Sequence, residues 1–402
     1  MNRLRINMDA LHHNLLQIER IVAERGGSWT LVTKVLCGNE EVISELIAMG
    51  VRSVGDTRID NFRSFPMADA PIERWYLRVP PPSMTGDIIH FTEVSLNSEK
   101  ATIRQLDRDA GAAGKRHKII VMIELGDLRE GVLPGSLIDF YTNIFSLPNI
   151  DVIGIGANLG CLSGAVPSVD QLMQLVLYRE LLELKFGHKL PFISAGTSAI
   201  LPLLDRCRIP TSVNHWRVGE SVFLGSDLIN GGTLSGFRDD AFILEAEIAE
   251  IKHKSMVPLG ETANVAPFEP LETESELFPG QRGRRALITA GELDTDVRGL
   301  IPLSPNCRIV GSSSDISVVH IDDDNDSCKV GDTLSFKLNY SALLRLMNGR
   351  YVPKVIQRCS TSPATSCSPT TQTSIPHVHE FSQKPPSTAP ADRPPQPEQD
   401  IL

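Results

Sequence analysis

The sequence predicts an α/β protein in which a (β/α)8 TIM-type barrel is followed by an all-β domain. From about residue 28 to 235, short β-branched runs alternate with segments whose apolar residues recur at helical spacing. This alternation gives eight strand-then-helix units in roughly the length that such a barrel needs. From about Phe242 the alternation stops and strand-like runs follow one another. An open doubly wound sheet is the alternative, but no GxGxxG motif follows the first expected strand.

The expected barrel strands are short and rich in β-branched residues. The first, Trp29–Val35, is followed by the helical segment Glu40–Met49. The other expected strands are Val51–Val54, Trp75–Val79, Glu93–Leu96, Lys118–Glu124, Val152–Ile155, Pro191–Ser194 and Asn214–Arg217. Amphipathic segments such as Asp170–Phe186 lie between most of them. We therefore expect the barrel to occupy residues 10–235.

The remaining segments complete the expected domain organisation. Further strands are expected at Ile243–Ile251, Ala286–Ala290, Ser317–Ile321 and Thr333–Leu338, with no long helical pattern between them. They predict a C-terminal β domain over residues 236–356, which a strand within residues 1–9 is expected to join. Residues 357–402 are rich in Ser, Thr, Pro and Gln and cannot bury enough apolar surface to offset the entropy of ordering. We expect them to form a disordered tail.

Composition excludes several classes of protein. A formal net charge of −10 argues against a general nucleic-acid binder, and no run of apolar residues is long enough to predict a membrane span. The N-terminal residues lack the apolar core of a signal peptide. Seven scattered cysteines, none in a CxxC pair, predict reduced thiols and no metal site. We expect a cytoplasmic protein.

Lys34 is the first candidate for chemistry. Functional groups of a barrel gather at the C-terminal ends of its strands, and Lys34 lies near the end of the first one, between Val32 and Val35. If its side chain enters the barrel mouth, loss of hydration disfavours the ammonium form and leaves an amine that can form an imine. A solvated lysine at a strand end is the alternative.

A phosphate site is predicted on the same rim. Ile193–Ser198 follows the seventh expected strand and opens a helix, so its glycine and hydroxyl residues offer backbone N–H and hydroxyl donors. Ordinary N-capping by Ser194 or Thr197 is the alternative. Barrels often bind phosphate between the loops after strands seven and eight, and the eighth loop contains Gly219. A phosphate site beside an imine-forming lysine indicates pyridoxal 5'-phosphate.

Motifs in the same order along most of the chain resemble the alanine racemase family, the fold III type of pyridoxal-phosphate enzymes, and within it the ornithine racemase branch most of all. The resemblance runs from Leu4 to about Pro353. The matching segments are Ile6–Asn14, Val32–Gly38, Gly55–Ile59, Leu125–Gly131, Gly156–Cys161, Arg217–Glu220, Gly311–Asp315 and Asn339–Leu344.

The resemblance implies a role for each matching residue. Lys34 would bind the cofactor as a Schiff base and act as one acid/base group. Asn158 would lie beneath or beside the cofactor ring. Arg129 would orient the substrate carboxylate or the cofactor hydroxyl, and a surface ion pair with Glu130 or Asp127 is its alternative. The phosphate would be bound by Ser194, Gly196, Thr197, Ser198, Gly219 and the hydroxyl of Tyr340.

Arg217 would face the pyridine nitrogen. An arginine stays protonated, so it would keep that nitrogen unprotonated and weaken the ring as an electron sink. This suits controlled proton exchange at Cα. Fold III decarboxylases tend to place an acidic residue there, and Glu220 is a near neighbour.

The second acid/base group differs from that of alanine racemase. A racemase needs two groups on opposite sides of Cα, and in alanine racemase the second is a tyrosine that reaches across a dimer interface. The corresponding position here holds Glu292, and the ornithine branch also lacks that tyrosine. Glu292 and Asp315 are candidates for the second base or for contact with a distal ammonium group. A structural role for both is the alternative.

The expected function is therefore racemisation of ornithine or a similar basic amino acid by a pyridoxal-phosphate-dependent homodimer. Three alternatives stay open: a racemase of alanine or another small amino acid, a fold III decarboxylase, and a non-catalytic carrier of the cofactor. Carriers usually lack the β domain.

Overall fold

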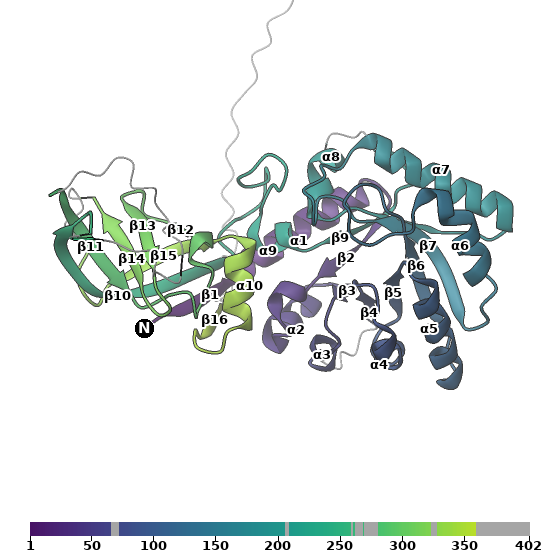
Figure 1. Ribbon diagram of the computed structural model, residues 1–402, viewed down its shortest axis with the longest axis horizontal. Coiled ribbons are helices and arrows are strands. Elements are labelled where there is room, and N and C mark those ends of the chain that lie inside the picture. The colour runs from purple at the N-terminus through teal and green to yellow at the C-terminus, as the bar shows by residue number, and fades with distance from the viewer. Residues whose placement is uncertain are drawn as a thin grey trace, which may run out of the picture. The chain divides into compact units, whose positions relative to one another are not determined.

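The computed structural model describes residues 1–65, 72–205, 209–258, 260–261, 268, 280–322 and 328–358. The expected disordered tail lies outside these residues except for Gln357 and Arg358, and Gln357 ends a strand. Residues 1–359 form one compact unit, and Figure 1 shows its helices and strands. The predicted fold class is confirmed, because a closed barrel of eight parallel strands is joined to a largely antiparallel sheet.

The barrel strands lie within a few residues of their expected positions. They are β2 (Ser28–Val32), β3 (Ser53–Asp56), β4 (Glu73–Tyr76), β5 (Val94–Asn97), β6 (His117–Met122), β7 (Ile150–Ala157), β8 (Phe192–Ala195) and β9 (His215–Val218). Parallel pairing of β9 with β2, with Ser28 opposite His215, closes the barrel. The first expected strand, Trp29–Val35, extends too far. Strand β2 ends at Val32, and Lys34 begins a 3-10 turn, η1 (Lys34–Leu36).

Helices follow the strands as the apolar spacing predicts. They are α1 (Met8–Ala23), α2 (Glu40–Ala48), α3 (Ile59–Arg63), α4 (Thr85–Phe91), α5 (Lys100–Ala112), α6 (Leu137–Ile144), α7 (Val169–Phe186), α8 (Leu201–Asp205) and α9 (Glu220–Leu224). Their ends carry local signals. Helix α7 begins with a capping box between Ser168 and Gln171, and it ends at Gly187 with φ of 63°.

Alternation along the strands produces two buried apolar layers. Successive side chains of a strand point to opposite faces, so Ile119 and Val121 pack in the main core while Ile120 and Met122 join a separate cluster with Trp75 and other residues. That second cluster fills the interior of the barrel, and the main core lies between the strands and the helices.

The C-terminal sheet includes the start of the chain. Its path runs β12 (Leu300–Pro302), β15 (Thr333–Leu338), β10 (Phe242–Ser255), β11 (Arg282–Ile288), β14 (Ser317–Ile321), β13 (Cys307–Ser312). Strand β1 (Arg3–Asn7) pairs antiparallel with β10 and parallel with β16 (Lys354–Gln357).

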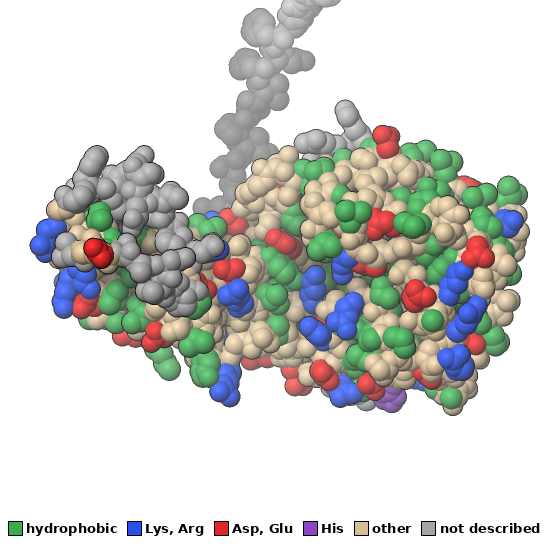
Figure 2. Space-filling view, viewed as in Figure 1, with side chains coloured by type: hydrophobic (Ala, Val, Ile, Leu, Met, Phe, Trp, Pro, Cys, Tyr) green, Lys and Arg blue, Asp and Glu red, His purple; other side chains and the backbone are tan. Residues whose placement is uncertain are grey.

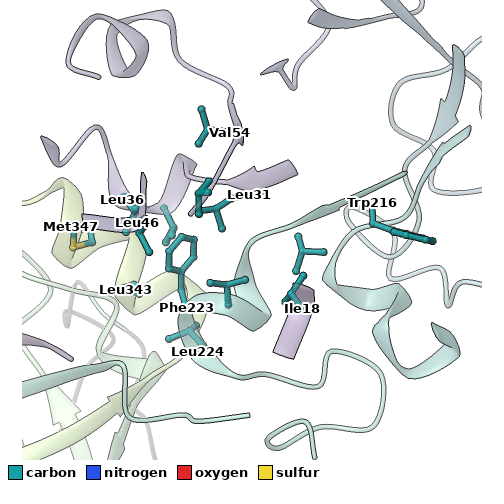
Figure 3. Close-up of a cluster of buried hydrophobic side chains, with 14 of the residues drawn as sticks. Ile18, Leu31, Leu36, Leu46, Val54, Trp216, Phe223, Leu224, Leu343 and Met347 are labelled. Atoms are coloured by element: carbon teal, nitrogen blue, oxygen red, sulfur yellow. The ribbon is translucent and has the colours of Figure 1, made fainter. Parts of the chain in front are cut away.

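One helix in this part of the chain, α10 (Tyr340–Asn348), is not among the expected elements. Asn339 caps it by accepting a hydrogen bond from the Ala342 N–H, at 2.9 Å. Leu343 and Met347, on its buried side, belong to the same hydrophobic cluster as Leu36 and Leu46 (Figure 3). Helix α10 thereby contacts the turn that carries Lys34.

On the face seen in Figure 2, acidic and basic side chains are interspersed. Within the described residues, no helix combines the length and the apolar character that crossing a membrane requires.

Candidate active site

A cavity of about 340 Å³ opens at the C-terminal ends of the barrel strands. Its walls come from the residues that follow β2, β3, β4, β6, β7, β8 and β9, and from the start of α10. The lining residues are Val32, Lys34, Thr57, Leu77, Arg129, Asn158, Gly160, Cys161, Thr197, Ser198, Arg217, Gly219, Glu220, Leu228 and Tyr340. Eight of the predicted site residues therefore share one cavity: Lys34, Arg129, Asn158, Thr197, Ser198, Arg217, Gly219 and Tyr340.

Lys34 is directed into the cavity by a tightly bonded turn. The preceding residue, Thr33, is fully buried and donates its hydroxyl to Asp56 Oδ2 at 3.1 Å. The turn then ends at Cys37 and Gly38, both with positive φ. Lys34 Nζ lies 5.6 Å from the centroid of the Tyr340 ring, within the range of a cation–π interaction. The Lys34 side chain is half-buried and lines the cavity.

Tyr340 carries a polar atom with no partner. Its Oη is buried, and no described residue hydrogen-bonds to it. Burial raises the pKa of the phenol above its usual range, and the nearby Glu220 carboxylate adds to that shift. A buried hydroxyl that lines a cavity and lacks a protein partner is available to a bound ligand.

Arg217 is buried and fixed by four hydrogen bonds. Nη1 donates to the carbonyl oxygen and the Oγ of Ser194, at 2.8 and 2.6 Å. Nη2 donates to Ala157 O and Asn158 Oδ1, both at 2.9 Å. Burial lowers the Arg217 pKa to about 10, so the group stays protonated at neutral pH. Among the described residues, no acceptor is bonded to Nε.

Arg129 forms the ion pair that the sequence offered as its alternative. Its Nε lies 3.0 Å from Glu130 Oε2, and its Nη1 donates to Cys161 Sγ at 3.3 Å. The pair is not a simple surface contact, because the Glu130 side chain is only 9% exposed. Arg129 also lines the cavity, so both expectations for it are compatible.

The loops after β8 and β9 meet through Ser198. Its Oγ accepts hydrogen bonds from the N–H groups of Gly219, at 3.3 Å, and Ser221, at 3.2 Å. Thr197 precedes the turn η4 (Ser198–Ile200) and accepts from the Ala199 N–H at 3.3 Å, which is the N-capping alternative for this residue. A Cβ at position 219 would lie 2.8 Å from Val32 O, so a glycine is required for this close approach.

Two residues expected to bind phosphate do not line the cavity. Ser194 is fully buried, and its Oγ is already bonded to Arg217 and to His215 Nδ1, the latter at 2.8 Å. Gly196 has φ of +92°, so it provides a turn that other residues rarely adopt. Neither residue lines the cavity, and Ser194 instead accepts hydrogen bonds from Arg217, which does.

Glu292 and Asp315 lie together, but outside this cavity. The backbone N–H groups of Glu292 and Leu293 donate to Ser313 O and Ser314 O, at 3.0 and 2.7 Å, which brings the two loops side by side. Glu292 Oε1 accepts from Ser312 Oγ at 2.8 Å, and its Oε2 lies 3.5 Å from Arg345 Nη1. Neither residue lines the cavity of its own chain.

Glu220 is the main cavity residue that sequence reasoning did not assign to the site. Burial raises its pKa, and the positive charge of Lys34 opposes that shift. Its position immediately after Gly219, in the expected phosphate-binding loop, could have indicated that it lies in the site. Among the described residues, no group of His, Cys, Asp and Glu is arranged to hold a metal ion.

Fold and site together define a family. The family model for the alanine racemase N-terminal domain matches residues 6–227, and the chain belongs to that family. Over 353 residues the chain is 33% identical to an ornithine racemase from Acetoanaerobium sticklandii, covering 88% of this chain and 98% of that protein. A lysine racemase from Thermotoga maritima is 31% identical over 356 residues, with the same coverage. The chain is thus an amino-acid racemase of the alanine racemase family.

Solved structures agree in fold. An alanine racemase from Streptomyces lavendulae has a TM-score of 0.67 at 18% identity, covering 89% of this chain and 97% of that one. An alanine racemase from Bartonella henselae with covalently bound pyridoxal phosphate has a TM-score of 0.66 at 14% identity, covering 89% and 99%. A D-threonine aldolase from Filomicrobium marinum has the same fold, with a TM-score of 0.64 at 14% identity, covering 88% and 91%.

The residues of the cavity fit pyridoxal phosphate. The cofactor needs an amine for its aldehyde, donors for its phosphate and a partner for its ring nitrogen. Lys34 could supply the amine, the Tyr340 hydroxyl has no described partner and could donate to the phosphate, and Arg217 has an Nε–H that no described acceptor uses. The glycine at position 219 allows the loop after β9 to approach Val32, at the end of β2, closely.

Proposed function

We propose that Lys34 binds pyridoxal 5'-phosphate covalently and that the protein interconverts the L- and D-enantiomers of ornithine or a similar basic amino acid. The observation that carries this proposal is the single cavity shared by Lys34, the buried Arg217 and the unpartnered Tyr340 hydroxyl. The relatives that are ornithine and lysine racemases support a basic substrate.

Bound in the cavity, the cofactor would supply an aldehyde for imine formation and a ring that withdraws electrons from Cα. Lys34 would release and return a proton on one side of Cα. Arg217 would hold a protonated guanidinium at the ring nitrogen and keep that nitrogen unprotonated. Arg129 would pair with the substrate carboxylate, and Asn158 would lie beside the ring.

Phosphate binding is assigned to Thr197, Ser198, Gly219 and Tyr340. Ser198 and Tyr340 would donate their hydroxyl groups, since Ser198 Oγ only accepts in its described hydrogen bonds and Tyr340 Oη has no described partner. Thr197 and Gly219 line the cavity beside them. Ser194 and Gly196 would contribute from behind the wall, by orienting Arg217 and shaping the turn.

The second acid/base group would come from a partner subunit. Glu292 and Asp315 are outside the cavity of their own chain, so they can act only if another copy presents them. Exposed apolar side chains support such a contact: Leu293, beside Glu292, is 68% exposed, and Leu128 and Leu162, near the cavity, are 75% and 66% exposed. We therefore propose a homodimer. The free cysteines Cys37, Cys161, Cys307 and Cys328 fit a reducing, cytoplasmic location.

Deuterium exchange tests the function directly. Cofactor-loaded protein would be incubated in deuterium oxide with L-ornithine, L-lysine, L-arginine, L-alanine and L-serine, and the products read by chiral chromatography and mass spectrometry. We expect deuterium at Cα and the D-enantiomer, fastest for ornithine or lysine, with K34A as the inactive control. Release of carbon dioxide would instead indicate a decarboxylase. No turnover of any basic amino acid would contradict the substrate assignment.

A further inference from the structure

Glu130 lies behind the cavity wall, between the two arginines that line it. One carboxylate oxygen, Oε2, pairs with Arg129 Nε at 3.0 Å. The other, Oε1, accepts a hydrogen bond from Asn158 Nδ2, and Asn158 Oδ1 in turn accepts from Arg217 Nη2 at 2.9 Å. A continuous chain of contacts therefore connects Arg129 and Arg217 through one carboxylate and one amide.

The loop that carries this carboxylate is held from both sides. Glu124 accepts the backbone N–H groups of Gly126, Leu128 and Arg129, at 2.6, 3.1 and 3.2 Å. Asp127, 2% exposed, accepts the N–H groups of residues 161–163 in the loop after β7, at distances between 3.1 and 3.3 Å. These hydrogen bonds join the loop after β6, which carries Glu130, to the loop after β7, and they fix the position of Glu130.

Charge makes the position of Glu130 consequential. Burial raises the pKa of its carboxyl, and the positive charges of Arg129 and Arg217 oppose that shift. The Glu130 carboxylate in turn favours the protonated form of Arg217, whereas Arg129 disfavours it. Without the carboxylate, the repulsion between the Arg129 and Arg217 charges would no longer be offset by Glu130.

We propose that Glu130 is a positioning residue that fixes Arg129 directly and Arg217 through Asn158, although it does not line the cavity itself. This inference rests on the proposed function, because it assigns the two arginines to the substrate carboxylate and the ring nitrogen. A shift of about 1 Å in such groups can reduce a rate by about 100-fold.

Glu130→Gln tests the role because the amide cannot satisfy both neighbours. One side of the carboxylate faces the Asn158 N–H and the other faces the Arg129 N–H, so the NH₂ of glutamine must oppose one donor. Glu130→Asp keeps the charge and should recover part of the loss. Glu183→Gln is the matched control, since Glu183 is another little-exposed carboxylate (12%) in an ion pair on the barrel, with Lys189.

Three measurements decide the outcome: KM and kcat/KM of the cofactor-loaded protein, and binding of pyridoxal phosphate to the cofactor-free protein. We expect Glu130→Gln to raise KM for the amino acid about 10-fold, to lower kcat/KM about 100-fold and to weaken equilibrium binding of pyridoxal phosphate. Wild-type values in Glu130→Gln, or an equal loss in Glu183→Gln, would overturn the positioning role. Crystal structures of the wild type and Glu130→Gln without cofactor give a separate readout. We expect Arg129 to leave its position, and unmoved arginines would overturn the inference even if the protein proved to bind no cofactor.

Discussion

Lys34 and Tyr340 come from opposite ends of the folded chain, yet Lys34 Nζ lies 5.6 Å from the Tyr340 ring centroid. Lys34 follows β2 of the barrel, whereas Tyr340 begins α10, after the C-terminal sheet. Packing of α10 against the Lys34 turn, through residues such as Leu343 and Leu36 (Figure 3), produces this approach. The C-terminal part of each chain therefore completes the cavity of its own barrel.

Tyr340→Phe should weaken cofactor binding without destabilising the apoprotein. The Tyr340 hydroxyl has no partner among the described residues, so removing it sacrifices no internal hydrogen bond. A hydrogen bond to a charged phosphate is worth roughly 1.5 kcal/mol or more, which predicts about a 10-fold rise in the dissociation constant. Spectroscopic titration with pyridoxal phosphate measures it.

Tyr141→Phe is the control for that variant. Tyr141 also has a buried Oη without a partner among the described residues, but it lies on α6 and outside the cavity. It should leave cofactor binding unchanged. Equal weakening in both variants would argue that Tyr340 does not contact the phosphate.

Lys34→Ala should abolish covalent attachment of the cofactor. The side chain supplies the only lysine amine among the residues that line the cavity, so borohydride reduction followed by peptide mapping should find no modified residue in the variant. Racemisation should fall by at least about 1,000-fold, since an acid/base group is lost as well. Reductive labelling of another lysine in the wild type would refute the assignment of Lys34.

Part of this site could be predicted from the sequence and part could not. Lys34, Arg217, Gly219 and Tyr340 could be predicted because they belong to segments that resemble the family, and the structure brings them into one cavity. Ser194 could not be placed, because its neighbours in sequence do not show that His215 and Arg217 already use its hydroxyl.

The sequence predicted the barrel strands but not the short helix α10. The barrel strands were predicted because burial on both faces gives continuous runs of β-branched residues. Helix α10 is only nine residues long and lies between strands, so the surrounding β pattern concealed it. Its apolar residues at 342, 343, 346 and 347 and the Asn339 cap were nevertheless detectable. The Glu130–Asn158 contact could not be predicted, because the two residues lie 28 positions apart in the chain.

Gly131→Ala should destabilise the loop that presents Arg129 and Glu130. A Cβ at position 131 would lie 2.2 Å from the Glu124 backbone nitrogen, so the backbone must move. We expect a loss of about 3 kcal/mol in the free energy of unfolding, together with reduced activity. Gly135→Ala is the control, because its Cβ would meet no atom within 4 Å. Equal stability of the two variants in urea unfolding would contradict the steric argument.

Acid should destabilise the protein through two buried histidines. His215 is fully buried, stacked on Trp75 at 4.4 Å, and bonded to Ser194 Oγ at 2.8 Å and Thr30 Oγ1 at 3.0 Å. Burial lowers its pKa to about 3, and the Arg217 charge adds to this. Burial likewise lowers the pKa of His117 to about 4.

Both folded-state pKa values lie below the ordinary histidine value of 6.5, so the unfolded chain binds more protons than the folded one between these pH values. Stability therefore falls as the pH falls from 6.5 towards 3–4. Each histidine should contribute a loss of about 2 kcal/mol by pH 5. Urea unfolding of the wild type and of His117→Gln between pH 7.5 and 5 measures this, and the variant should show roughly half the histidine-dependent slope. A wild-type stability independent of pH across that interval would mean that these imidazoles are not buried in the neutral form.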